Sequence, residues 1–552
     1  MLAWSGSTLA RLGATGSSVP SPRVGSMAPT PLLTLSLRKA LGCYLLLAVP
    51  LVWLGIVTTD VFRMEGLIAN GAASMQSWED ACVPKVYGEI YAYKPPLAYW
   101  LAKGSFAGFD SIDRWSLRLP FGLCALLLGG AVLGLLARVA GTRAGLWAAL
   151  ATVSGFLLTS KLGMATFDVP LALGVGVATT AATVNLTREK PGLGLWMLAY
   201  FGLGIGFLAK GPIALALFVP GLVLAGWVAA RGRGLLAWPH GSGVALFAAM
   251  IGAWTVCALR HHGAESFDQA STEASLRLFD YRFPHNLQQP LRPLQAIVFF
   301  FPWSLFVLLG LTGWRGTQAF PTPRVLRIAC AFLGGNALFL FVIATFEPRY
   351  YLPLAAPVGV VSGLTIERYL QAGSAWTARW SQGLRWATPL MGLGLLGCAL
   401  QTAVPLGWIA RAALGSLGLV GCLAGSKRWF QSTTPEGAVV WRSLVLACLL
   451  AGLQLGFLRP QKAYTRSGRG LAQAVDEVLP PGAEVWTDTK DGHSSLFFYL
   501  GHPVRTFERA GAPPSDVWVL LDAQAAEAAQ WPSKTIGTFP VQGRTFVLRK
   551  SL

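Results

Sequence analysis

Two stretches near the start of the chain carry side chains whose types and spacing could do chemistry. Asp60 and Arg63 follow the first long apolar run and stand three residues apart, as on one face of a short helix. Residues 93–100 read YKPPLAYW, and the two prolines hold Lys94 in an extended segment before the next apolar run. A carboxylate can act as a base, and fixed cations stabilise a developing anion.

A helix is expected to carry the first of these pairs. Apolar residues recur there at helical spacing, at Val61, Met64, Ile68 and Met75. We therefore expect a helix that lies at the membrane surface and turns Asp60, Arg63 and Asn70 toward a cleft.

Each of these residues also has a purely structural explanation. Asp60 could cap a helix, its pair with Arg63 could be a weak surface ion pair, and Lys94 could extend to the membrane interface. Lys210 in Ala-Lys-Gly-Pro and Arg349 beside two tyrosines are equally ambiguous. A functional role is favoured because several separate loops bring a cation to the same side, beside acidic residues.

Composition places the chain in a membrane. It has 552 residues, of which 53% are hydrophobic and 12% charged, and its mean hydropathy is +0.52. A soluble domain carries about twice that share of charge. The net charge of +19 does not indicate a nucleic-acid partner, because the basic residues sit in short loops between apolar runs, as the positive-inside rule predicts.

The order of apolar runs and basic loops predicts about thirteen membrane spans. The expected fold is mainly α, a polytopic transmembrane helical bundle. We expect a disordered cytoplasmic tail over 1–35, the bundle over 36–458 and a small external α/β domain over 459–552. Two external loops with juxtamembrane helices are expected over 59–118 and 260–292. Acidic residues fall almost entirely outside, although they were not used in this assignment.

The last segment is expected to cover the substrate or to stabilise the fold as a cap. Residues 466–479 read as an amphipathic helix, and the runs 483–487, 494–500, 516–521 and 544–549 read as strands. The segment contains no nucleophile elbow, phosphate loop or metal signature.

The cysteines predict no disulfide framework. Seven of the eight fall in or beside apolar runs, and only Cys82 lies in an expected external loop. No pair has the spacing of a metal site.

Taken in order, these elements resemble a known family. Asp60 with Arg63 is followed by YAYKPPLAYW, TFDVPLAL, GFLAKGP, RF with His285, FFFPW and RYYLPLAAP. They are similar in sequence and order to the integral-membrane GT-C glycosyltransferases of the ArnT-like and dolichyl-phosphate-mannose protein mannosyltransferase type. The resemblance covers about residues 41–361. It implies transfer of a sugar from a polyprenyl-phosphate donor to a lipid, glycan or protein acceptor at the extracytoplasmic face.

The resemblance also implies roles for individual residues. Asp60 is the expected base or acceptor-orienting carboxylate, Asp168 is the second catalytic acid, and Lys94 would hold the donor phosphate. Further expected phosphate contacts are Arg63, Lys210, Arg282 and Arg349. The residues expected to line the substrate site are Tyr93, Tyr99, Trp100, His285 and Tyr350. Direct displacement predicts inversion at C1 of the sugar, and the Arg-rich loops favour a bacterial inner membrane with the site facing the periplasm.

The chain departs from the family pattern in three places. Val61 stands where an acidic residue is usual, Glu65 comes one position early, and Tyr93 precedes the motif lysine where glutamate is common. In some relatives that glutamate helps to hold a metal or the acceptor. We therefore expect no metal site and no certain cofactor; a divalent cation, if one binds, would have His285 and Glu89 as partners.

Two other classes of membrane protein stay open. A lipid-linked oligosaccharide ligase or polymerase shares a polytopic fold with large external loops, but would depend on external Arg and His rather than on Asp60. A transporter or flippase would favour ionisable residues at mid-span and repeated halves. The expected span centres here are almost free of charge, and the sequence has no internal repeat.

Overall fold

A computed structural model describes most of the chain from residue 35 onward. The described residues are 35–62, 64–229, 235, 238–269, 271–272, 291–312, 323–343, 347–372, 374, 376–402, 406–426, 433–464, 466–488, 494–507, 512–541 and 544–552. The expected tail up to residue 34 lies outside them, as do three predicted site residues, Arg63, Arg282 and His285.

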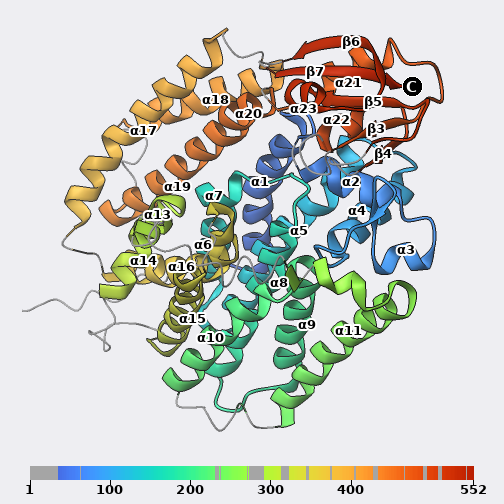
Figure 1. The fold of residues 1–552 in the computed structure, drawn as a ribbon. Coiled ribbons are helices and arrows are strands. Elements are labelled where there is room, and N and C mark those ends of the chain that lie inside the picture. The colour runs from blue at the N-terminus through green and yellow to red at the C-terminus, as the bar shows by residue number, and fades with distance from the viewer. Residues whose placement is uncertain are drawn as a thin grey trace, which may run out of the picture. The chain divides into compact units, whose positions relative to one another are not determined.

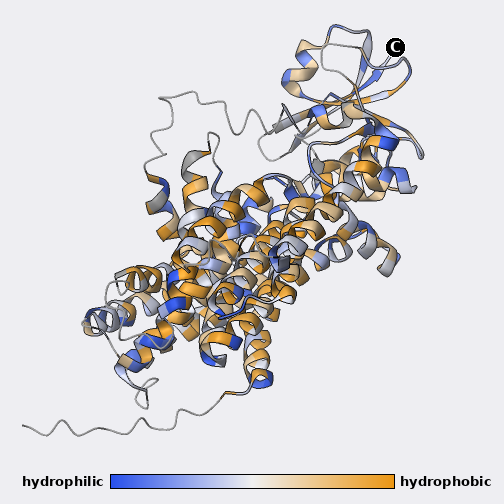
Figure 2. Ribbon diagram, turned by 90° about the horizontal axis from the view of Figure 1, so that it is seen from below, coloured by the Kyte–Doolittle hydropathy of each residue, from blue (hydrophilic) through white to orange (hydrophobic). Residues whose placement is uncertain are grey.

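Mostly apolar helices build the chain up to Leu453 (Figures 1 and 2). The longer ones are α1 (Leu37–Val57), α5 (Arg114–Ala140), α6 (Thr142–Ser154), α8 (Asp168–Thr187), α9 (Leu193–Lys210), α10 (Ile213–Val228), α11 (Trp238–His262), α14 (Trp303–Thr312), α15 (Pro323–Val342), α16 (Ala355–Ala372), α17 (Thr377–Leu400), α18 (Trp408–Ala424) and α19 (Pro435–Leu453). Small residues let neighbours approach closely: a Cβ on Gly174 of α8 would collide with the backbone of Gly206 on α9.

Seven of the described helices are long and apolar enough to cross a membrane. They are α1, α5, α8, α9, α11, Pro323–Leu340 within α15, and the stretch Pro435–Asp476 that begins with α19. The helices α10 and α18 are apolar but shorter. The mainly helical architecture is confirmed, whereas the layout with thirteen spans stays a prediction.

The loop after α1 holds α2 (Met64–Ala73), α3 (Trp78–Cys82), the two-residue strands β1 (Lys85–Val86) and β2 (Glu89–Ile90), and α4 (Leu97–Phe109). The predicted surface helix differs here, because α2 starts after Asp60 and ends before Met75. Most of α2 is buried, including Leu67 and Ile68, so it does not lie half-exposed at the membrane surface. Asn70 instead accepts a hydrogen bond from the amide of Tyr87 at 3.2 Å.

The chain ends in a small mixed sheet, as predicted. Its strands are β3 (Val485–Thr487), β4 (Val504–Thr506), β5 (Trp518–Asp522), β6 (Ser533–Val541) and β7 (Arg544–Ser551), in the order β4-β3-β5-β7-β6. β3 pairs parallel to β4 and β5, while β5, β7 and β6 pair antiparallel. The helix α21 (Arg469–Asp476) matches the predicted amphipathic helix.

One strand prediction in this sheet is wrong. Residues 494–500 were expected to form a strand, but Ser494–Tyr499 form the helix α22. A short apolar run fits a buried helix as well as a strand, and its pattern alone does not decide between them. Leu496 and Phe497 of this helix are buried in an apolar cluster with Leu520 and Leu548 of the sheet.

The same apolar cluster joins the C-terminal sheet to the loop after α1. We call it the shared core. From the loop it includes Leu67, Ile68, Ala72, Tyr87, Ala98 and Tyr99, and from the C-terminal segment Leu471, Val475, Leu496, Phe497 and Leu548. The rings of Tyr87 and Phe497 meet edge to face at 4.9 Å. In Figure 1, α2 and α4 lie beside the sheet accordingly.

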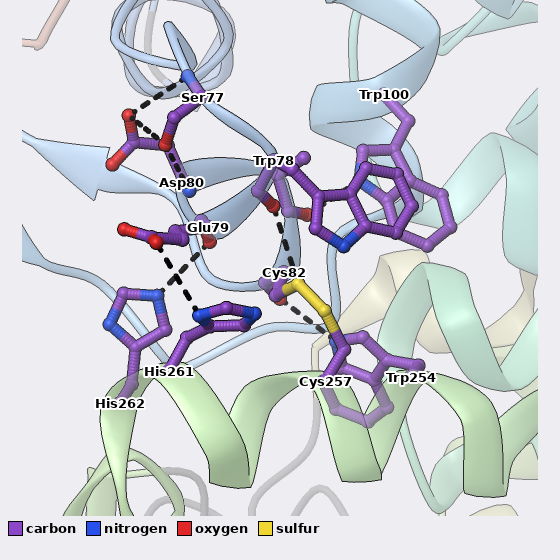
Figure 3. The surroundings of a disulfide bond; sticks show 11 residues. Ser77, Trp78, Glu79, Asp80, Cys82, Trp100, Trp254, Cys257, His261 and His262 are labelled. Carbon is purple, nitrogen blue, oxygen red and sulfur yellow. Dashed lines mark hydrogen bonds and ion pairs between the residues drawn. A yellow bond between two sulfur atoms is a disulfide. The ribbon is translucent and has the colours of Figure 1, made fainter.

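A disulfide joins Cys82 at the end of α3 to Cys257 in α11, with the Cα atoms 5.9 Å apart (Figure 3). The prediction of no disulfide is wrong, because Cys257 was placed within an apolar span. It stands five residues before the end of α11 at His262, close enough to meet the loop. Trp254, one turn earlier, donates from its indole to the carbonyl of Cys82 at 2.9 Å.

We expect the Cys257→Ser variant to unfold at a lower temperature than the wild type in detergent. A disulfide that closes a long loop contributes about 2–5 kcal/mol, and this one spans 175 residues. The exposed free cysteine Cys43 supplies the control, since Cys43→Ser should leave the midpoint unchanged. A Cys82→Ser, Cys257→Ser double variant should lose no more than the single variant. Equal midpoints for wild type and Cys257→Ser would contradict a stabilising bond.

Candidate active site

The carboxylate of Asp60 stands three residues after the end of α1, on a backbone that Arg118 holds. Arg118 lies in the first turns of α5 and is fully buried. Its guanidinium donates to the carbonyls of Ile56, Thr59 and Asp60, each at 2.8 Å. These carbonyls would otherwise be unpaired where α1 ends, so Arg118 both caps α1 and fixes the start of the loop.

Glu65 completes the coordination of this arginine. Its two carboxylate oxygens each accept a hydrogen bond from the guanidinium at 2.8 Å, and both side chains are fully buried. Burial alone would raise the pKa of Glu65, but the charges of Arg118 and Arg459 and the hydrogen bonds lower it below its usual value. The glutamate that comes one position early in the family pattern is therefore a buried ionised partner of Arg118.

Glu65 also connects Asp60 to the segment that precedes Asp168. Its Oε1 accepts the amide of Ala165 at 3.0 Å. Arg459, buried after α19, donates to the carbonyls of Leu162 and Gly163 in the same segment. The two acidic loops thus share one buried set of hydrogen bonds, although no contact joins the side chains of Asp60 and Asp168 among those described.

The side chain of Asp60 is about one-third exposed and faces the C-terminal segment. Ser467 and Arg469 both lie 3.4 Å from its carboxylate oxygens. The amide of the next residue, Val61, donates to the phenol oxygen of Tyr499 at 2.6 Å. Burial, together with the charge of Asp60, raises the pKa of Tyr499 to about 12, so the phenol stays neutral near neutral pH.

Asp168 begins α8 and is paired with Lys210, the last residue of α9. Both side chains are almost buried, at 5% and 10% exposure. The ammonium of Lys210 also lies 4.5 Å from the centre of the Tyr350 ring. Arg349 forms an ion pair with Glu347 at 2.6 Å. Its pKa is raised, because the charges of Asp168 and Glu347 outweigh the effect of burial.

The motif around Lys94 meets the segment around Lys210. Gly211 has a φ of +74°, which favours glycine, and a Cβ there would touch the Pro95 ring at 3.7 Å. Lys94 is half-buried, and its ammonium donates to the carbonyl of Tyr93 at 3.2 Å. The KPP motif therefore approaches the loop that directly follows Lys210, whereas a joint role of these residues at one site stays a prediction.

The aromatic residues predicted to line the substrate lie in different surroundings. Tyr93 is exposed, whereas Tyr99 is fully buried in the shared core with its ring 5.6 Å from that of Phe167. The Trp100 indole donates to the carbonyl of Ala81 at 2.7 Å, and Tyr350 is buried beneath Lys210. Their role toward a substrate stays a prediction.

The described residues do not fit a metal site. No group of three or more His, Cys, Asp or Glu side chains that could hold a metal ion occurs in the described part of the chain. Glu89, one of the two predicted partners of a cation, accepts a hydrogen bond from Thr506 at 2.8 Å.

The sequence did not predict the residues that surround Asp60 and Val61, which are Arg118, Ser467, Arg469 and Tyr499. The place of Arg118 inside the run SLRLPFGL, against an apolar background, could have marked it as buried. Ser467 and Tyr499 gave no signal, because they meet Asp60 only through the fold of the C-terminal segment.

Comparisons with known proteins bear on this arrangement. Residues 93–256 match the family model described as dolichyl-phosphate-mannose-protein mannosyltransferase. Curated protein sequences gave no match. The chain is similar in structure to ArnT from Cupriavidus metallidurans bound to undecaprenyl phosphate, with a TM-score of 0.74 and 17% identity over 92% of this chain and 97% of that one. The same protein in the apo state gives a TM-score of 0.71 and 16% identity over 92% and 97%.

The family model covers both the KPP motif and the Asp168–Lys210 pair. The structural similarity extends over nearly the whole length of both chains. The resemblance predicted from the sequence is thereby confirmed: the chain is a multi-pass membrane protein with the ArnT fold, and its residues 93–256 match the model of the dolichyl-phosphate-mannose-protein mannosyltransferase family.

Proposed function

We propose that the protein is a membrane glycosyltransferase that moves a sugar from a polyprenyl-phosphate donor to a lipid, glycan or protein acceptor. The observation that carries this proposal is the close approach of Pro95 to Gly211, which brings the segment of Lys94 near the segment of Lys210, the partner of Asp168. Fixed cations that converge from separate elements suit a phosphate group. That the similar ArnT structure holds undecaprenyl phosphate supports a lipid carrier of this kind.

In the proposed reaction the acceptor oxygen attacks C1 of the sugar while the bond from C1 to the phosphate oxygen breaks. The electron pair of that bond stays on the phosphate, which gains negative charge. Lys94, with Lys210 and Arg349, stabilises this charge more in the transition state than in the ground state. Asp60 takes the proton of a hydroxyl acceptor, or orients an acceptor that is already anionic. Attack opposite the leaving group inverts C1.

Asp168 serves this chemistry through Lys210. Its nearly buried carboxylate forms an ion pair with the ammonium, and the Tyr350 ring lies against the same group. A lysine held by a carboxylate and an aromatic face is fixed in one position. Asp168 is thus a positioning acid for Lys210, in addition to any contact with the acceptor.

The layout that we propose has thirteen spans, the bundle over 36–458, an external domain over 459–552, and the site on the periplasmic face of a bacterial inner membrane. The disulfide supports this orientation. Disulfides persist in oxidising compartments such as the periplasm, and Cys82 lies in the loop between Asp60 and Lys94.

Reconstitution tests the function directly. Purified protein in liposomes receives polyprenyl phosphate carrying one labelled sugar, with candidate acceptors, and protein-free liposomes serve as the blank. We expect label to leave the lipid and the product to carry inverted C1. Transfer only from pyrophosphate-linked oligosaccharides would favour the hypothesis of a ligase. Label that crosses the bilayer while still attached to its lipid would favour a flippase.

The Lys94→Gln variant should raise the KM for the donor about ten- to hundredfold. A hydrogen bond to a charged group contributes about 1.5–3 kcal/mol, and the glutamine keeps a polar end but carries no charge. The matched control is Lys103→Gln, which changes a lysine in the helix α4 that follows Lys94, and it should leave the KM unchanged. The measurement is initial rate against donor concentration. An unchanged KM in Lys94→Gln would remove Lys94 from the phosphate site.

A further inference from the structure

The peptide unit between Asp60 and Val61 is held from two sides by distant parts of the chain. Its carbonyl accepts from Arg118 of α5 at 2.8 Å, and its amide donates to Tyr499 of α22 at 2.6 Å. Carbonyl and amide point in opposite directions across a trans peptide. The bundle therefore holds one edge of this peptide plane, and the C-terminal domain holds the other.

Fixing that plane fixes the direction of the Asp60 side chain. The orientation of the plane sets ψ of Asp60, and the preceding carbonyls of Ile56 and Thr59 are already bound to Arg118. Val61 itself is fully buried, so its amide cannot donate to bulk water instead if the phenol oxygen of Tyr499 is removed. Ser467, from the same C-terminal segment, lies 3.4 Å from the carboxylate.

The contact is built into a packed surface. The helix α22 belongs to the shared core through Leu496 and Phe497. Gly468, next to Ser467, lies against the backbone of Leu496 so closely that no Cβ would fit. This packing fixes the positions of Tyr499 and Ser467 relative to each other and to the loop after α1.

We propose that Tyr499 is a positioning residue for catalysis, and that the C-terminal domain thereby forms part of the active site rather than a cover over it. This inference rests on the proposed role of Asp60. Tyr499 touches neither donor nor acceptor in this account; it acts by holding the backbone that aims Asp60.

The test compares Tyr499→Phe with Tyr44→Phe. The first removes the phenol oxygen that accepts the Val61 amide and keeps the ring. The second removes another buried tyrosine hydrogen bond, to the carbonyl of Leu126 at 2.8 Å, which joins α1 to α5 away from Asp60. Two quantities are measured: steady-state transfer, and hydrogen exchange of the peptide that contains the Val61 amide.

We expect Tyr499→Phe to lower kcat about ten- to hundredfold with the donor KM unchanged, because a misplacement of about 1 Å costs up to about a hundredfold. The Val61 amide should exchange at least about tenfold faster. Tyr44→Phe should change neither. Faster exchange with unchanged kcat would overturn the positioning role, and unchanged exchange would overturn the contact itself.

Hydrogen exchange needs no substrate, so the two proposals can fail separately. A wild type that transfers no sugar would remove the proposed function, while the exchange of Val61 would still show whether Tyr499 holds this segment. If Tyr499→Phe does not fold, kcat is measured instead for the two variants Ser467→Ala and Ser467→Thr. The threonine should restore kcat because it keeps the hydroxyl, and equal kcat in both variants would overturn the role of this domain.

Discussion

Replacing Asp60 with asparagine should lower kcat for transfer to a hydroxyl acceptor by about a hundred- to ten-thousandfold, the range supplied by a positioned general base. Asparagine has nearly the same shape, and its one carbonyl oxygen can still accept from either Ser467 or Arg469, which lie 3.4 Å from different carboxylate oxygens of Asp60. The backbone contacts to Arg118 and Tyr499 do not involve the side chain, so the fold should be kept. The measurement is single-turnover transfer at saturating donor.

The control for this variant is Asp516→Asn, which changes a highly exposed carboxylate in the C-terminal domain. Its kcat should equal that of the wild type. Equal transfer by Asp60→Asn and wild type would remove Asp60 from the proton transfer and make Asp168 the next residue to test. A loss of kcat that is confined to hydroxyl acceptors would show that Asp60 acts as a base rather than as a general charge.

The Glu65→Gln variant should lose about 3–5 kcal/mol of unfolding free energy, which is the cost of leaving a buried charge without its partner. Both side chains of the Glu65–Arg118 pair are fully buried. Because the pKa of Glu65 is lowered in the folded state, its contribution is present above the ordinary glutamate pKa of about 4.3 and is lost as the pH falls below it. Denaturant unfolding in detergent at neutral pH measures the loss.

Two further variants separate charge from packing. The Glu65→Leu, Arg118→Met double variant should recover part of the lost stability, because the buried charge of Arg118 is then no longer left without Glu65. Lys550→Met breaks an exposed pair with Asp516 and should cost less than about 1 kcal/mol. A double variant less stable than Glu65→Gln would show that the carbonyl contacts of Arg118 matter more than its charge.

The sequence was informative where a motif is local. Lys94, Lys210 and Asp168 each sit at the junction of a loop with an apolar run, and hydropathy alone places such junctions at the ends of a bundle. The approach of Pro95 to Gly211 is consistent with both segments lying at the same end of the helical bundle. The amphipathic helix at Arg469–Asp476 was predictable for the same reason, since its apolar stripe is local.

The residues that were missed depend on pairing across the chain. Cys257 lies in an apolar run, and its bond to Cys82 depends on where α11 ends relative to the loop. The run at 494–500 carries no local feature that separates helix from strand. Tyr499 looks like one more core aromatic until the fold brings its oxygen to the Val61 amide. Hydropathy and spacing describe neighbours in sequence, and these contacts join residues that are not neighbours.

The hydrogen bond between Val61 and Tyr499 joins residues 438 positions apart, and this has a consequence for how the protein is made. A ribosome delivers the loop after α1 early and delivers α22 near the end of synthesis. Until then Leu67, Ile68 and Tyr99 lack the residues that the C-terminal segment contributes to the shared core. A chain that stops before α22 therefore has every expected cation and acid of the bundle in place, yet exposes an apolar surface that quality-control proteases can recognise. The loop after α1 is therefore fully packed only in a chain whose translation has reached the C-terminal segment.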